Sequence, residues 1–202
     1  MGFKASWVWE SAYRTGENYL DVEISVRSAT RVPDAGAETV VPVARRGGYP
    51  ECMAELRLVE LSASTIVAVN NMSLKPGQEQ FLAPTSYAVA GAVVNPTTAW
   101  QRVVVDGDEV VGFVSANFDL DAPQDYFRSV LWRINVDADD QGRGVGRFAV
   151  AGLLEEARAR QMDRVNVIYE AGEGGPEAFF RRVGFTPVDE TEYGEVVAEI
   201  RL

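Results

Sequence analysis

Histidine is absent from this sequence of 202 residues, and cysteine occurs only once, as Cys52. Without histidine, a catalytic Ser-His or Cys-His pair is excluded, and so is any metal site that depends on imidazole ligands. A lone cysteine excludes an intrachain disulfide framework and a cysteine metal cluster. We therefore expect a protein that holds no metal.

Long apolar runs are missing as well. No stretch of eighteen consecutive apolar residues occurs, so the sequence predicts no membrane-spanning helix and no membrane partner. The first residues, with Lys4 and Glu10 around Trp7 and Trp9, lack the apolar centre of a signal peptide. These absences predict a cytoplasmic protein.

Basic residues are scarce relative to acidic ones. The chain has 19 Lys and Arg against 30 Asp and Glu, a formal net charge of −11. Such a charge argues against nucleic acid as a partner, because phosphate backbones favour basic surfaces. It would raise the local concentration of a polycation, although acidity that only maintains solubility explains the charge equally well. The length and the 47% of hydrophobic residues suit one α/β domain with an extension.

A glycine-rich turn is the most informative feature that is present. The apolar run 130–136 predicts a buried strand, and residues 147–160 have the apolar spacing of a helix. Between them stands Gln-Gly-Arg-Gly-Val-Gly at 141–146. Glycines let the backbone approach a ligand, and a helix N-terminus offers unpaired N–H groups to an anion. The segment therefore predicts a phosphate site, with Arg143 and Arg147 placed to pair with phosphate oxygens.

The spacing of this turn separates it from other nucleotide motifs. A P-loop ends in Gly-Lys-Ser/Thr, which occurs nowhere in the chain. A dinucleotide fingerprint needs one more residue before its last glycine, where Arg147 stands. What remains is Gln-x-x-Gly-x-Gly, and an ordinary strand-to-helix turn would also satisfy it.

Further elements are predicted on both sides of the turn. Asp106-Gly107-Asp108 is a tight hairpin signal, and Pro176 and Gly184 suit the first turn and the C-terminal cap of a helix. The predicted strands are 53–59, 100–105, 109–114, 165–169 and 194–202.

The turn, the order of these elements and the segment Arg-Arg-Val-Gly-Phe at 181–185 together resemble GNAT-type N-acetyltransferases, which use acetyl-CoA. The resemblance covers about residues 53–202. It implies an α/β (α+β) fold with a central mixed, mostly antiparallel sheet flanked by helices, in which strands 4 and 5 splay apart. Dimerisation is common in that family, so a homodimer is an open expectation.

A narrower resemblance is to bacterial spermine/spermidine (diamine) N-acetyltransferases. It depends on residues 81–88, Leu131-Trp132-Arg133, the loop 172–177 and the ending Gly-Glu-Val-Val at 194–197. It implies transfer of acetyl to a primary amine such as a polyamine, by direct attack on the thioester. Two alternatives stay open: acetylation of an aminoglycoside-like or protein amine, and a non-catalytic acyl-CoA-binding domain.

The resemblance also assigns residues to the acetyl-CoA site. Backbone groups of the fourth strand would bind the pantetheine amides, and the N–H groups of the glycine turn would hold the pyrophosphate. The residues so assigned are Ile134, Asn135, Val136, Gln141, Gly142, Arg143, Gly144, Val145, Gly146, Arg147 and Phe179.

Catalysis requires two proton transfers. The candidates for the base that deprotonates the amine are Asp119, Asp121, Asp125 and Glu170, each of which could equally be a solvated loop carboxylate. In the family motif, a tyrosine four residues before Gly-Phe protonates the leaving thiolate, but here Phe180 takes that place. Three explanations for Phe180 are open: Tyr169 could act as the acid instead, the thiolate could leave unassisted or through water, or the domain could bind acyl-CoA without catalysis. Tyr169 could also be a core aromatic residue with no catalytic role.

The acceptor pocket is expected around residues 81–92, a loop that enters a helix. Tyr87, Asp125 and Tyr126 are its candidate contacts. Aromatic rings can bind cations, and Phe81, Trp100 and Trp132 are further candidates, although such residues more often belong to the core.

Residues 1–52 form an N-terminal extension without a clear pattern. Because a domain-like strand begins at Met53, translation could start there, with the upstream sequence assigned in error; an extension that packs on the domain is the alternative.

Overall fold

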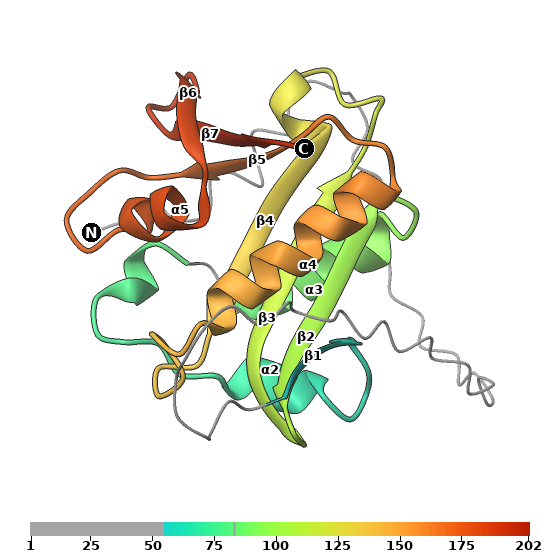
Figure 1. The fold of residues 1–202 in the computed structure, drawn as a ribbon, viewed down its shortest axis with the longest axis vertical. Helices are drawn as coiled ribbons and strands as arrows, with labels where there is room; N and C mark the ends of the chain where they lie inside the picture. The colour runs from blue at the N-terminus through green and yellow to red at the C-terminus, as the bar shows by residue number, and fades with distance from the viewer. Residues whose placement is uncertain (1–54, 83) are drawn as a thin grey trace, which may run out of the picture. The chain divides into compact units, whose positions relative to one another are not determined.

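The computed structural model describes residues 55–82 and 84–202 (Figure 1). The expectations for residues 1–52, including Cys52 and a start at Met53, concern residues outside this part of the chain. Within it, no helix is long and apolar enough to cross a membrane.

The centre of the fold is a seven-stranded sheet in the order β1-β2-β3-β4-β5-β7-β6 (Figure 1). Every neighbouring pair is antiparallel except β4 and β5, which are parallel. The predicted mixed, mostly antiparallel sheet is therefore confirmed. The strands are β1 Leu56–Glu60, β2 Ala99–Asp106, β3 Glu109–Phe118, β4 Ser129–Val136, β5 Arg164–Tyr169, β6 Thr186–Glu190 and β7 Val196–Arg201.

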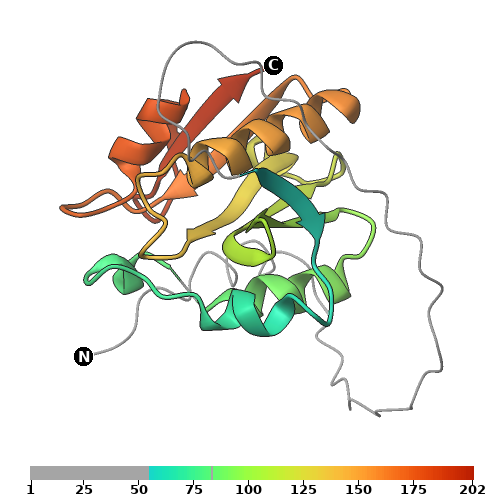
Figure 2. The same ribbon diagram turned by 60° about the horizontal axis from the view of Figure 1, so that its bottom comes forward.

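Helices cover both faces of the sheet (Figure 2). On one face α4 packs mainly against β3 and β4, while α2 and α3 pack on β3 and β2 from the other face. The helices are α2 Ile66–Asn71, α3 Thr85–Val94, α4 Val145–Ala159 and α5 Glu177–Val183, with short 3₁₀ turns η1 Gln78–Gln80 and η2 Asp125–Phe127.

The core has two parts, one on each face. The larger lies under α4 and α5 and includes Leu131, Leu153 and Phe180, whereas the smaller contains Val69 and Phe113. Gly152 lets α4 lie close to β1, because a Cβ there would lie 2.1 Å from Leu58 Cδ1. The face under α4 is thus closely packed along the length of that helix.

The parallel pair β4–β5 is incomplete. Only Val130↔Asn166 and Leu131↔Val167 are in register, although both strands continue beyond these pairs. The C-terminal parts of β4 and β5 are therefore not hydrogen-bonded to each other, as expected for splayed strands. This gap determines where a ligand can reach the backbone of the sheet.

Two elements were not predicted from the sequence. The helix α2 has only six residues, including three β-branched ones, and gives no sustained helical period. The strand β6 begins Thr-Pro and carries Asp and Glu, which suit the edge of a sheet but not a central strand. The other predicted elements are present, with boundaries shifted by a few residues.

Truncation of the core under α4 should be costly. Leu153 is 0% exposed, so Leu153→Ala should lower the free energy of unfolding by ~2–5 kcal/mol through lost burial and a cavity. Leu120, 67% exposed, provides the matched control, and Leu120→Ala should change stability by less than ~0.5 kcal/mol. Urea denaturation measures both, and equal effects would contradict the assignment of Leu153 to the core.

Candidate functional site

A cleft of about 370 Å³ lies where β4 and β5 separate. It receives residues from both faces of the sheet: Phe179 and Phe180 come from α5, and Phe81 and Leu82 from the segment before α3. Of the residues assigned from the sequence, the cleft brings together Ile134, Asn135, Val136, Gln141, Gly142, Gly146, Tyr169, Glu170, Phe179 and Phe180.

One end of the cleft is the glycine turn before α4. Gly142 and Gly144 have φ of 90° and 95°, a left-handed conformation that residues with a Cβ rarely adopt. Across residues 55–82 and 84–202, no acceptor is found for the N–H groups of Gly142, Gly144, Val145, Gly146 and Arg147. Unsatisfied donors at the positive end of a fifteen-residue helix suit an anionic group.

Gln141 holds this turn in place. Its Nε2 donates to the Val136 carbonyl at 3.1 Å and to Gln78 Oε1 at 2.8 Å, while its Oε1 accepts from Gln78 Nε2 at 3.0 Å. Asp137, which follows β4, is hydrogen-bonded to the segment after α2, because its carboxylate accepts from the Ser73 N–H at 2.9 Å. The side-chain amide of Gln141 therefore anchors the turn to β4 and to η1.

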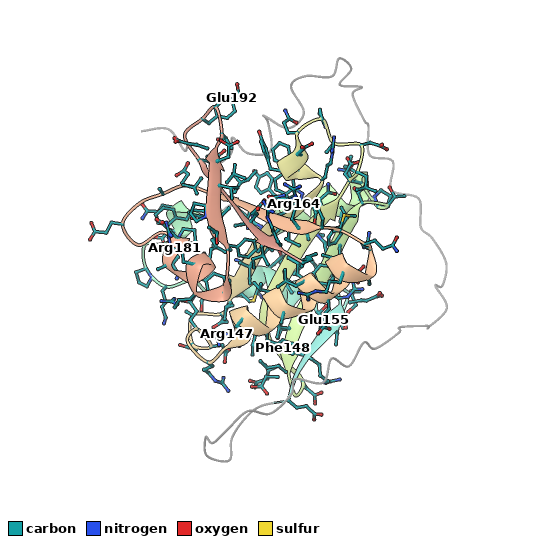
Figure 3. All side chains as sticks on the ribbon, turned by 45° about the horizontal axis from the view of Figure 1, so that its top comes forward. Arg147, Phe148, Glu155, Arg164, Arg181 and Glu192 are labelled. Atoms are coloured by element: carbon teal, nitrogen blue, oxygen red, sulfur yellow. The ribbon has the colours of Figure 1, made fainter. Side chains whose placement is uncertain are left out.

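The two arginines of the turn differ in their surroundings. The Arg143 guanidinium pairs with Asp140 and, at 3.3 Å, with Asp106, so it lies over the β2–β3 hairpin and does not line the cleft. Arg147 is exposed at the start of α4 (Figure 3) and forms no ion pair with any described residue. Arg147 is therefore the better placed of the two to meet an anion at the helix N-terminus.

Phe179 packs against the first turn of α4. A Cβ at Gly146 would lie 2.9 Å from Phe179 Cε2, so a glycine is required for this contact. Val145, at the same turn, is 3% exposed and faces Gly112 of β3. These contacts fix the position of the helix N-terminus relative to the cleft.

The end of β4 supplies a buried acceptor. Asn135 is 7% exposed, and its Oδ1 is buried without a hydrogen-bond partner in the described part of the chain. A buried acceptor without a donor is unfavourable by ~1–3 kcal/mol. Since Asn135 also lines the cleft, an N–H donor bound there would satisfy it.

Tyr169 and Phe180 are stacked. Their ring centroids are 5.3 Å apart with an interplanar angle of 27°, and Phe180 also contacts Phe179 and Phe185. The Tyr169 hydroxyl is buried and has no partner among the described residues. Burial, and then the charge of Glu177, raise the pKa of Tyr169 above its ordinary value of 10.0, against a smaller opposing effect of Arg181. Tyr169 therefore stays protonated at neutral pH.

The other end of the cleft is lined by Phe81, Trp132, Arg133 and Glu170. A Cβ on either Gly172 or Gly175 of the β5–α5 loop would lie within 3.6 Å of Phe81 Cε1, so this loop contacts the segment before α3. Burial lowers the pKa of Arg133 to about 10. Arg133 and Glu170 thus place opposite charges at this end.

The remaining predicted residues lie outside the cleft. Tyr87 is 56% exposed on α3, and Asp125 pairs with Arg128 at 2.8 Å. Tyr126 lies on η2, next to Phe127, which stacks on Trp132. Burial raises the pKa of Tyr126, and the nearby carboxylates of Glu192, Asp189 and Glu195 raise it further. The other residues proposed from the sequence that do not line the cleft are Arg143, Gly144, Val145 and Arg147 of the glycine turn, together with Trp100, Asp119 and Asp121.

Several residues of the site were not assigned from the sequence. Ile168 and Arg182 line the cleft, and Glu195 immediately precedes β7, the strand that pairs with β5. Alternation along β5 could have identified Ile168, since it shares a face with Glu170. Glu195 could not have been found this way, because only the pairing of β5 with β7 brings it close to the cleft.

Comparison with known proteins gives consistent results. The family model of the acetyltransferase (GNAT) family matches residues 68–185. A mycothiol acetyltransferase from Beutenbergia cavernae is 35% identical over 94 residues, 46% of this chain and 30% of that protein. An L-2,4-diaminobutyric acid acetyltransferase from Shouchella clausii is 31% identical over 81 residues, 40% of this chain and 44% of that protein. The matches thus span less than half of either relative.

Among solved structures, the PaiA N-acetyltransferase from Thermoplasma acidophilum in complex with coenzyme A superimposes with a TM-score of 0.56. The alignment covers 73% of this chain and 99% of that chain at 10% sequence identity. A likeness at this level of identity concerns the fold.

The unpartnered hydroxyl of Tyr169 predicts an unusual response to mutation. Tyr169→Phe removes a buried polar atom without removing a hydrogen bond, so it should raise the free energy of unfolding of the ligand-free protein by ~1 kcal/mol. Tyr193→Phe, at a residue 56% exposed, is the control and should be neutral. Urea denaturation measures both; a destabilised Tyr169→Phe variant would mean that the hydroxyl has a partner.

Proposed function

Since the chain belongs to the acetyltransferase (GNAT) family, we propose that it transfers the acetyl group of acetyl-CoA to a primary amine of a small cationic acceptor. The observation that carries this proposal is the cleft between β4 and β5, which combines free N–H groups at the start of α4 with strand ends that do not pair with each other. The amine attacks the thioester directly, and a chain without histidine lacks the usual activated nucleophile for an acyl-enzyme.

The residues of the cleft fit acetyl-CoA. The free N–H groups of Gly142 and of residues 144–147 suit the pyrophosphate, and Arg147 adds a positive charge. The end of β4 offers backbone groups to the pantetheine arm, and the orphaned Oδ1 of Asn135 suits one of its amide N–H groups. Phe179 then covers the arm where it passes α4.

The chemistry needs few groups. A backbone N–H on the edge of β4 that is not paired with β5 would polarise the thioester carbonyl and stabilise the charge that develops on its oxygen. Glu170, in the cleft, is placed to receive a proton from the acceptor ammonium. As the C–N bond forms and the C–S bond breaks, a second proton must leave the nitrogen and another must reach the sulfur.

Tyr169 is our candidate for protonating the sulfur. Its ring stacks on Phe180, which occupies the position of the family's tyrosine. Its raised pKa keeps it protonated and therefore able to donate. The hydroxyl, having no partner among the described residues, is free to serve this role.

A small amine acceptor is supported by the charge of the protein and by its relatives. The cleft contains Glu170, and the net charge of −11 attracts cations. The names of both relatives refer to small molecules. A polyamine or a diamino acid is therefore our first choice. Because Phe180 lacks a hydroxyl, a non-catalytic acyl-CoA-binding domain is the second candidate.

A thiol-release assay tests the proposal. Wild-type protein with acetyl-CoA should release free CoA in the presence of one class of amine, among spermidine, spermine, diaminobutyrate, aminoglycosides and lysine peptides. Release that requires the amine establishes the transferase. Binding of acetyl-CoA without release with any amine would favour the binding domain.

The roles of the aromatic pair are tested in the same assay. General acid assistance is worth ~10²–10⁴-fold, so Tyr169→Phe should lower kcat by at least ~10-fold while acetyl-CoA affinity stays unchanged. Phe180→Tyr in the Tyr169→Phe background should restore part of the rate, because it returns a hydroxyl to the family's position. Tyr193→Phe is the control, and an unchanged kcat in Tyr169→Phe would exclude Tyr169 as the acid.

A further inference from the structure

We propose that Glu195 is a positioning residue that acts through Glu170, the two carboxylates forming a pair that takes up the proton of the acceptor ammonium. This inference rests on the proposed function and extends it to a residue outside the cleft lining. Glu170 is the member that contacts the acceptor, whereas Glu195 stands opposite it, just before β7, and determines how strongly the pair holds a proton.

The register of the sheet brings the two carboxylates together. β5 and β7 pair antiparallel up to Tyr169↔Val196, the last pair of the ladder. The next residues along both strands are Glu170 and Glu195, which therefore stand opposite each other just beyond the ladder. Alternation places both side chains on the face opposite Tyr169, since Tyr169 belongs to the core under α4 and α5.

Glu195 is held rigidly and is largely removed from water. It is 9% exposed, and its Oε2 accepts a hydrogen bond from Thr191 Oγ1 at 3.1 Å. Thr191 Oγ1 in turn accepts from the Glu195 N–H at 3.2 Å, and the Thr191 N–H donates to the Glu195 carbonyl at 2.8 Å. The turn between β6 and β7 thus fixes the carboxylate beside the end of β5.

The surroundings of Glu195 are acidic. It faces Glu170 from β5, Thr191 from its own turn and Tyr126 from η2. Asp189, Glu192 and Tyr193 of the β6–β7 hairpin also lie near Tyr126, and Figure 3 shows Glu192 at the outer end of this hairpin. Among residues 55–82 and 84–202, no arginine or lysine forms an ion pair with Glu195, whereas Arg133 of β4 and Arg182 of α5 line the cleft with Glu170.

These surroundings favour the protonated form. Burial raises the pKa of Glu195 most, the hydrogen bond from Thr191 opposes this in part, and the charge of Glu170 raises it further. Glu195 stands opposite Glu170 just beyond the β5–β7 ladder, so a proton taken up by the two carboxylates relieves the repulsion between them. A base works best when its pKa lies nearer the working pH.

The protons balance as follows. One proton moves from the ammonium nitrogen to the carboxylate pair and leaves a neutral amine. The nitrogen forms a bond to the carbonyl carbon, the C–S bond breaks, and the second proton leaves the nitrogen while the thiolate sulfur gains one. The pair then releases its proton to water, so each turnover yields the amide, a thiol and one free proton.

The test is the pH dependence of kcat/KM for the amine in wild type, Glu195→Gln, Glu170→Gln and Glu195→Asp. Glu195→Gln should lower the rate at neutral pH by at least ~10-fold and move the ascending limb of the profile to lower pH. Glu170→Gln should lower the rate further than Glu195→Gln does. Glu195→Asp should return the ascending limb part of the way to its wild-type position. Glu173→Gln, at an exposed glutamate of the β5–α5 loop, is the matched control.

Two further measurements separate this role from a structural one. Acetyl-CoA affinity should be the same in Glu195→Gln and wild type. Because the pKa of Glu195 is raised in the folded state, its ionisation destabilises the fold as pH rises through that pKa. Glu195→Gln should therefore match or exceed the Tm of wild type at pH 8, with the difference lost below pH 4.5, the ordinary pKa.

Each outcome has a distinct meaning. An unchanged pH profile in Glu195→Gln, or an equal shift in Glu173→Gln, overturns the inference and leaves the proposed function intact. Failure of wild type to acetylate any amine overturns the proposed function and the inference with it.

Discussion

The structure depends on an unfinished pairing between two parallel strands. β4 and β5 share only two register pairs before they separate, and beyond these pairs the edges that face each other have no strand partner, although β3 and β7 pair with the outer edges. Buried N–H and C=O groups require partners, so a sheet opened in this way is completed only by something that enters the gap. The turn before α4, the start of α5 and the end of β4 all converge on that opening.

The turn before α4 shows how the chain maintains this arrangement. Its donors remain available because its own side chains are used elsewhere: Gln141 binds Gln78 and the Val136 carbonyl, and Arg143 binds Asp106 and Asp140. Had the Gln141 amide oxygen or the Asp140 carboxylate folded over the turn instead, it would have accepted hydrogen bonds from these N–H groups. The polar residues of the motif therefore determine the position of the turn, while its backbone is left for the ligand.

Local signals in the sequence were sufficient for much of this fold. The two-residue turn at Gly107, the buried run of β4 and the caps around α5 each depend on residues close in sequence, so pattern and propensity identify them. The partners of Gln141 and Arg143 and the proximity of Glu195 to Glu170 arise from residues far apart in the chain. Such contacts follow from sheet order and register, which a single sequence does not encode locally.

The cleft extends through the sheet from one face to the other. Phe179 and Arg182 line it from the side of α4 and α5, and Phe81 and Leu82 line it from the side of α2 and α3. Within residues 55–82 and 84–202, the sheet therefore opens where β4 and β5 separate, and the two ligands of the proposed reaction would reach the same point from opposite faces. An inhibitor that joins both ligands covalently would have to pass through this opening, so its linker must be thin and unbranched between β4 and β5.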